Sequence, residues 1–155
     1  MFGLALLAGV ALAADQQYQV SVTSNLTAIV PPAQMEQAPA WVSGQTNAAG
    51  AYVQVSGGPI YMCLVSPGTA STNAPAGNAV LLADGYRWAQ AGKGARLGLV
   101  VSAVSGTNDL YVSGIALQSP YGSFTASGAE CPQGTILAKT AQGTNTVAVW
   151  IWGAR

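Results

Sequence analysis

The chain has 155 residues, half of them hydrophobic, and only ten charged residues, five basic and five acidic, so its net charge is zero. The charged share of 6% compares with roughly 25% in an ordinary soluble domain. The basic residues are scattered, whereas binding to nucleic acid or to an anionic membrane surface requires clustered Lys and Arg. Neither is therefore expected as a partner. So little charge favours a permanent homo-oligomer, or packing against capsid or filament neighbours, over a secreted monomer with a polar but uncharged surface.

Residues 1–13 form an apolar run that ends in Ala11-Leu12-Ala13, a small-x-small pattern typical of signal-peptide cleavage. No Lys or Arg precedes the run, which a signal peptide ordinarily has. The run is too short to cross a bilayer, which takes about 20 residues, so no membrane span is expected. Two interpretations stay open: a cleaved signal peptide, or a retained apolar arm that packs into an assembly.

Residues 18–30 alternate between apolar and polar side chains, and Pro31-Pro32 ends the alternation. A period of two over 13 residues predicts one long strand with a buried face. Residues 14–40 are therefore interpreted as a β arm followed by a proline linker. The strand could pair with a neighbour's sheet or be the first strand of the chain's own sheet.

From residue 41 to residue 155 short β-prone runs alternate with turns rich in Gly, Pro and Asn. Strands are predicted at 52–55, 60–65, 97–104, 110–117, 136–140 and 146–152. Five-residue loops at 105–109 and 141–145 predict two hairpins, 97–104 with 110–117 and 136–140 with 146–152. The fold class is all-β, an antiparallel sandwich or barrel of short strands with an extended N-terminal arm.

The sequence lacks the residues that most enzymes need. It contains no histidine, and it has no phosphate-binding or nucleophile-elbow pattern. Five scattered carboxylates and two distant cysteines offer no metal site, so no cofactor is expected and the protein is predicted not to be an enzyme. Cys63 and Cys131 could form one disulfide if the chain is secreted, or stay reduced as small buried hydrophobes in a cytoplasmically assembled particle.

The aromatic and turn residues of the segment 41–92 resemble a small β module of phage structural proteins, which is similar to the chitin-binding modules of secreted polysaccharide hydrolases. The matching elements, in chain order, are Trp41, Gly50-Ala51-Tyr52-Val53, Gly57-Gly58, Tyr61-Met62-Cys63, Gly68-Thr69, Pro75 and Asp84-Gly85-Tyr86-Arg87-Trp88. The segment departs from the pattern at Gly68-Thr69-Ala70-Ser71, where the module has Gly-Thr-Ser, and at Tyr86, where it has a small residue. The resemblance implies a closing strand at the Asp-Gly-x-x-Trp element.

The C-terminal residues 134–139 and 147–151 resemble the closing hairpin of phage head-decoration and fibre proteins. There a Gly-x-x-Leu-x-Lys strand pairs with a terminal Val-x-Val strand. Both resemblances imply a virion structural protein.

The aromatic residues are the candidate contacts for a glycan or a protein partner. Trp41, Tyr61 and Trp88 either pack the core of the module or stack against sugar rings. Trp150 and Trp152 share one face of the last strand, whose other face is also apolar, so the strand is predicted to be buried on both sides. The alternative is a ligand-binding platform formed by the two tryptophans.

These observations predict a virion structural protein, a capsid-decorating or fibre subunit that acts by oligomeric packing and can add host-surface adhesion. The alternative is a secreted carbohydrate-binding or cell-surface filament protein. Either interpretation puts the protein on the virion surface or outside the cell, with a polysaccharide as a candidate partner.

Overall fold

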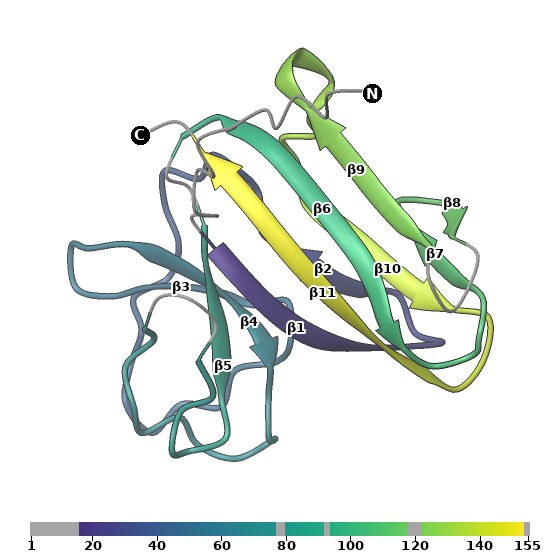
Figure 1. The fold of residues 1–155 in the computed structure, drawn as a ribbon. Helices are drawn as coiled ribbons and strands as arrows, with labels where there is room; N and C mark the ends of the chain where they lie inside the picture. The colour runs from purple at the N-terminus through teal and green to yellow at the C-terminus, as the bar shows by residue number, and fades with distance from the viewer. Residues whose placement is uncertain (1–15, 77–79, 92–93, 118–121, 154–155) are drawn as a thin grey trace, which may run out of the picture.

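The computed structural model describes residues 16–76, 80–91, 94–117 and 122–153, so the apolar run 1–13 lies outside the described residues. Within them the protein is all-β and antiparallel, as predicted, and its sheets form a sandwich and not a closed barrel (Figure 1). In these described ranges the only helical element is one 3-10 turn, Gly128–Glu130.

The strands form three sheets. Sheet A has the order β1-β11-β6-β9, sheet B the order β2-β10-β7-β8 and sheet C the order β3-β4-β5. Their bounds are β1 (Gln16–Thr23), β2 (Thr27–Val30), β3 (Tyr52–Gln54), β4 (Ile60–Val65), β5 (Arg87–Ala91), β6 (Arg96–Ser105), β7 (Leu110–Val112), β8 (Ile115–Leu117), β9 (Ser123–Ser127), β10 (Ile136–Thr140) and β11 (Thr144–Gly153).

Sheets A and B are linked strand by strand. Each strand of sheet A is joined along the chain to the strand in the same position of sheet B: β1 to β2, β10 to β11, β6 to β7 and β8 to β9. Eight antiparallel strands connected in this way form a jelly roll, the double-sheet arrangement built from Greek keys. Sheet C is inserted in the chain between β2 and β6 and lies beside the sandwich (Figure 1).

The core of the sandwich follows the period of two in its strands. In β1 the even-numbered Tyr18, Val20 and Val22 are buried, whereas Gln17 and Gln19 point outward. Across the sheet Tyr18 pairs with Val149 and Val20 pairs with Val147, so apolar partners line the same inner face. The hydroxyl of the buried Tyr18 donates to the carbonyl of Ile29 at 2.5 Å, which links sheet A to sheet B.

The predicted single strand over residues 18–30 is wrong, because the segment folds as two strands in different sheets. The chain turns at residues 24–26, where Thr27 donates its hydroxyl to the Asn25 carbonyl at 3.0 Å. Of the two alternatives for the arm, the chain's own sheet is the one observed, since all eight residues of β1 pair with β11. The proline linker is likewise docked, through a hydrogen bond from the Ala33 amide to the Gln133 carbonyl.

The two predicted hairpins are also wrong. β6 pairs with β11 and β9, and β10 pairs with β2 and β7, so both Gly- and Asn-containing loops cross from one sheet to the other. The loops are joined at one end of the sandwich by the buried Asn145. Its side-chain Nδ2 donates to the backbone carbonyl of Asn108 at 2.7 Å, and its Oδ1 accepts from the side-chain Nδ2 of Asn108 at 3.3 Å. A side chain at Gly106 would collide with Asn145, which explains why this loop carries glycine.

Residues 110–117, predicted as one strand, form the β7–β8 hairpin. Ser113 and Gly114 connect the strands with positive φ angles of 49° and 82°, the combination of a type I′ turn. The Ser-Gly pair in the sequence is a turn signal that could have predicted this break. β9 was not predicted: its residues Ser-Phe-Thr-Ala-Ser alternate between polar and apolar, but the run is short and Phe124 is its only large apolar residue.

Sheet C and the described loops around it have a small core of their own. β4 is buried on both faces: Met62 and Leu64 pack into the sandwich core, whereas Tyr61 and Cys63 pack into the second cluster. An unbroken apolar run is what a strand covered on both sides requires. Of the Asp84-Gly85-Tyr86-Arg87-Trp88 element, Arg87 and Trp88 begin β5, which pairs with β4.

Candidate functional site

Two of the predicted contact residues are unavailable to a ligand in this structure. Trp88 is fully buried and Tyr61 is 6% exposed, and both belong to the core of sheet C. Trp88 stacks on Tyr86 with ring centroids 5.5 Å apart. Trp41 is half-buried against the same cluster, and its Nε1 donates to the hydroxyl of Ser71 at 3.2 Å. The three aromatic side chains therefore pack in the module, which is the first of the two alternatives considered for them.

The polar residues of the module resemblance form an internal network that holds its loops. One oxygen of the Asp84 carboxylate accepts from the amides of Thr72 and Asn73 at 2.8 and 2.9 Å. Partial burial opposes ionisation of Asp84, but these hydrogen bonds and one from the Tyr86 amide outweigh it and lower the pKa of the carboxyl below its usual value. The motif thus has a structural role in the loops.

The two cysteines are free thiols and do not form the disulfide considered from the sequence. Cys63 lies in the core of sheet C and Cys131 in the core of the sandwich. Burial raises the pKa of Cys63 to about 12, and burial also raises the pKa of Cys131 against the opposing effect of Arg96. Both behave as small buried hydrophobes.

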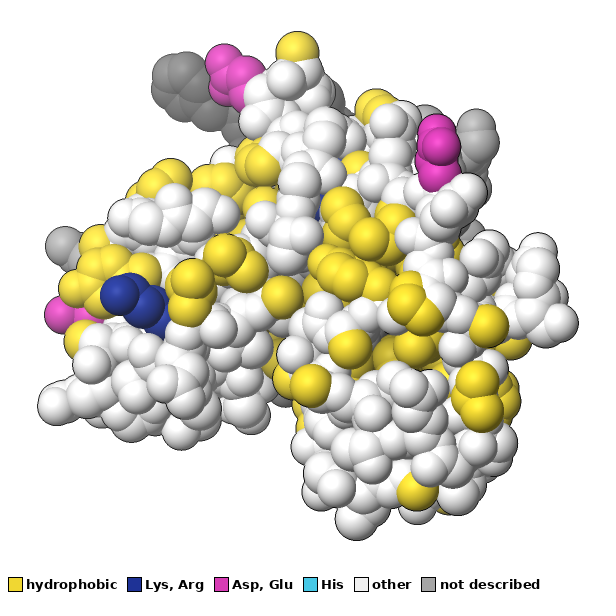
Figure 2. Space-filling view, turned by 180° about the vertical axis from the view of Figure 1, so that it is seen from behind, with side chains coloured by type: hydrophobic (Ala, Val, Ile, Leu, Met, Phe, Trp, Pro, Cys, Tyr) yellow, Lys and Arg dark blue, Asp and Glu magenta, His cyan; other side chains and the backbone are white. Residues whose placement is uncertain are grey.

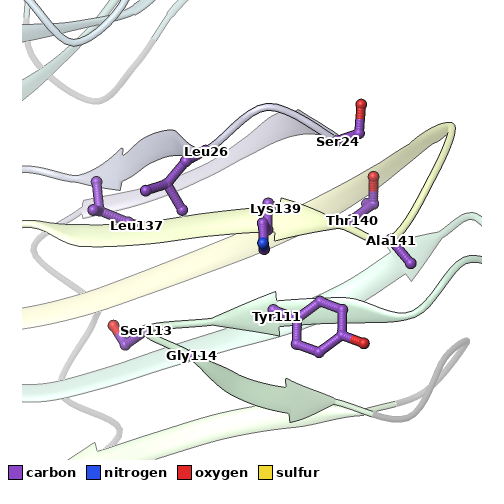
Figure 3. A pocket seen from close by; sticks show the side chains of 9 residues that line it. All are labelled: Ser24, Leu26, Tyr111, Ser113, Gly114, Leu137, Lys139, Thr140 and Ala141. Atoms are coloured by element: carbon purple, nitrogen blue, oxygen red, sulfur yellow. The ribbon is translucent and has the colours of Figure 1, made fainter.

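A first surface of interest is the outer face of sheet B, which we call the sheet B trough. It is a depression of about 700 Å³ over β10, β7 and the connection between β1 and β2, which supplies Ser24 and Leu26. Figure 3 shows the residues that line it: Ser24, Leu26, Tyr111, Ser113, Gly114, Leu137, Lys139, Thr140 and Ala141. Leu26 is 63% exposed and Leu137 is 36% exposed, and Lys139 is the only charged residue of the lining.

The trough belongs to a side of the molecule with few charges. Figure 2 looks at the side of sheet B, where hydrophobic side chains are uncovered and basic and acidic side chains are confined to a few places. Lys139 lies opposite Tyr111 in the β10–β7 register. The trough therefore offers aliphatic and aromatic surface with a single cation, which suits contact with another protein surface better than a charged small molecule.

A second surface of interest is the outer face of sheet A, where the last strand carries Trp150 and Trp152. The prediction that this strand is buried on both faces is wrong: Val147, Val149 and Ile151 lie in the core, whereas both tryptophans are partly exposed on the outside. Trp152 lies over Gly98, since a Cβ there would be 3.2 Å from the indole ring.

Next to Trp150 the outer face has a hollow of about 490 Å³, which we call the Ala148 hollow. Its lining is Gln17, Tyr18, Gln19, Val104, Ala148 and Trp150. Ala148 is too small to fill the space between its larger neighbours, so it forms the floor. The sequence indicated the tryptophan of this site but not the two glutamines, although their positions opposite Trp150 and Ala148 follow once β1 is paired with β11.

Comparison of the chain with protein-family models, with curated proteins and with solved structures finds no match. In the part of the chain that the structure describes, no helix is long and apolar enough to cross a membrane. The same residues bring together no group of three side chains that could hold a metal ion. The two outer faces of the sandwich are therefore the sites from which a function can be argued.

Proposed function

We propose that the chain is a virion structural protein, a capsid-decorating or fibre subunit that acts by packing against copies of itself on the virion surface. The observation that carries this proposal is the sheet B trough, an uncovered apolar face with one charged residue. Fully burying an exposed leucine side chain stabilises a contact by about 1.5–3 kcal/mol. Leu26 is 63% exposed and Leu137 is 36% exposed, so burying what remains open of both is equivalent to burying about one whole leucine.

Two further features support assembly. The chain carries ten charged residues in 155, too few to solvate a monomer of this size comfortably. The jelly roll is common in viral capsid and lectin domains, an argument from fold analogy alone. The trough supplies the contact face through which such an assembly would form.

Light scattering and native mass spectrometry test the proposal on the full-length chain. We expect a stable oligomer or filament for the parent protein and dissociation toward monomer for the double variant Leu26→Glu, Leu137→Glu. Val42→Glu is the matched control, since Val42 is 55% exposed on the module and lies outside the trough. A parent that stays monomeric at high concentration, or a control that dissociates as the trough variant does, would contradict the proposal.

A secreted carbohydrate-binding protein is the second candidate function. The specific observation in its favour is the Ala148 hollow, with an indole and two amide side chains at its wall. Host-surface adhesion by a virion protein would use the same chemistry.

A further inference from the structure

We propose that the Ala148 hollow and the adjoining outer face of sheet A bind a neutral polysaccharide. This inference deepens the carbohydrate-binding candidate by naming a site and a ligand class, and it does not require the assembly through sheet B.

The shape of the hollow is set by the register of three strands. Gln17 lies opposite Trp150 and Gln19 lies opposite Ala148 in the β1–β11 pairing. Residues directly opposite each other on one face have Cβ atoms about 5 Å apart, so the amides stand beside the indole and above the alanine floor. Val104 of β6 closes another side of the hollow.

The face continues from the hollow as a polar strip toward β9. Ala148 pairs with Ser102, which pairs with Ser123, and the neighbouring row runs from Trp150 through Val100 to Thr125. Measured across the four strands from β1 to β9, which lie about 4.8 Å apart, the hollow and the strip together extend about 14 Å. This length accommodates more than one sugar ring. Hydroxyl side chains therefore follow the amides along the direction in which a glycan chain would lie.

The chemistry of the lining selects the ligand. An indole offers an apolar face on which the C–H face of a sugar ring can stack. Each glutamine amide both donates and accepts hydrogen bonds, as a sugar hydroxyl does. Within the described residues no hydrogen bond engages the side-chain amides of Gln17 and Gln19 or the Nε1 of Trp150, so these groups are available to a ligand.

Other ligand classes fit the hollow less well. None of its lining residues is charged, so an ionic ligand would find no counter-charge there. The nearby Arg87 already donates to the Gln19 carbonyl at 2.7 Å. A wholly apolar ligand would cover the two amides without satisfying their hydrogen bonds, which is unfavourable. A neutral sugar ring can form hydrogen bonds with both glutamine amides through its hydroxyls and can stack its apolar face on the indole of Trp150.

The test is retention of the full-length protein on five insoluble neutral polysaccharides: cellulose, chitin, mannan, starch and β-1,3-glucan. We expect the parent to be retained by at least one of them and the double variant Gln17→Ala, Gln19→Ala to lose about tenfold in apparent affinity. Ala148→Leu, which fills the hollow without removing a contact group, should lose as much. The control is Ala116→Leu, the same change at an exposed position of sheet B, which should bind as the parent does.

The melting temperature of each variant shows whether its fold is kept. Only variants that melt at the same temperature as the parent are compared in the binding assay. The proposal is overturned if none of the five polymers retains the parent or if Ala148→Leu binds undiminished. It is also overturned if Ala148→Leu changes the oligomeric state and not the retention, because the hollow would then be a protein contact. The trough variant Leu26→Glu, Leu137→Glu leaves the hollow intact, so the assembly and glycan proposals can fail separately.

Discussion

Replacing Arg96 by alanine should strongly destabilise the sandwich. Its side chain is 3% exposed, and its guanidinium donates to the carbonyls of Pro132 and Pro31, the latter at 2.6 Å. Two longer bonds of 3.4 Å reach the Gly134 carbonyl. The guanidinium thus joins the start of β6 to the proline linker and to the loop before β10. It adds to two backbone hydrogen bonds between these segments, from the Ala33 amide to the Gln133 carbonyl and from the Gly94 amide to the Ala33 carbonyl.

The expected cost of Arg96→Ala is about 3 kcal/mol of unfolding free energy. Each of the two shorter bonds is made by a charged group and contributes about 1.5–3 kcal/mol. Removing a buried cation also removes its desolvation penalty, which offsets part of that loss. The groups that lose their hydrogen-bond donor are neutral carbonyls and not a carboxylate. The cost therefore stays at the lower end of the 3–5 kcal/mol typical of broken buried ion pairs.

Urea unfolding followed by tryptophan fluorescence measures this cost. With an m-value of about 2 kcal/mol/M, the midpoint should fall by about 1.5 M, and the melting temperature by about 6–12 °C. The control is Arg87→Ala, because Arg87 also donates to a backbone carbonyl but through an exposed hydrogen bond. That variant should lose less than about 1 kcal/mol. Equal losses at both arginines would refute the reasoning that burial makes the Arg96 contacts strong.

Two further predictions concern the loops. Because its pKa is lowered in the folded state, Asp84 stabilises the protein above its unfolded pKa of about 3.9 and loses that effect as the pH falls through the folded value. The advantage of the parent over Asp84→Asn, about 1 kcal/mol at neutral pH, should therefore shrink below about pH 4 when urea unfolding is followed across pH; a difference that stays constant with pH would contradict the prediction. Asn145→Ala should lower the free energy of unfolding in urea by about 1–2 kcal/mol, because it breaks the hydrogen bonds to Asn108. The control Asn25→Ala, in the β1–β2 connection, should lower it by less than about 0.5 kcal/mol. Similar losses in both variants would show that the two loops are not held together by the Asn108–Asn145 pair.

The sequence by itself determined which segments are strands wherever side-chain period and composition are unambiguous. The alternation in β1 predicted its buried face, and the apolar run of β4 predicted a strand. Both signals are local, because a strand with one covered face must alternate and a strand with two covered faces must not. The tryptophans of β11 were recognised as candidate contacts on the same local basis.

Only the tertiary structure decided which strands pair and which faces stay open. A short loop with Gly and Asn can return the chain within one sheet or carry it to the opposing sheet, and the loop sequence is compatible with both. The choice depends on contacts far apart in the chain, such as Asn108 with Asn145 and Tyr18 with Ile29. For the same reason the glutamines of β1 became part of a site only when β11 was placed beside them, since residues 17 and 150 meet through pairing and not through sequence.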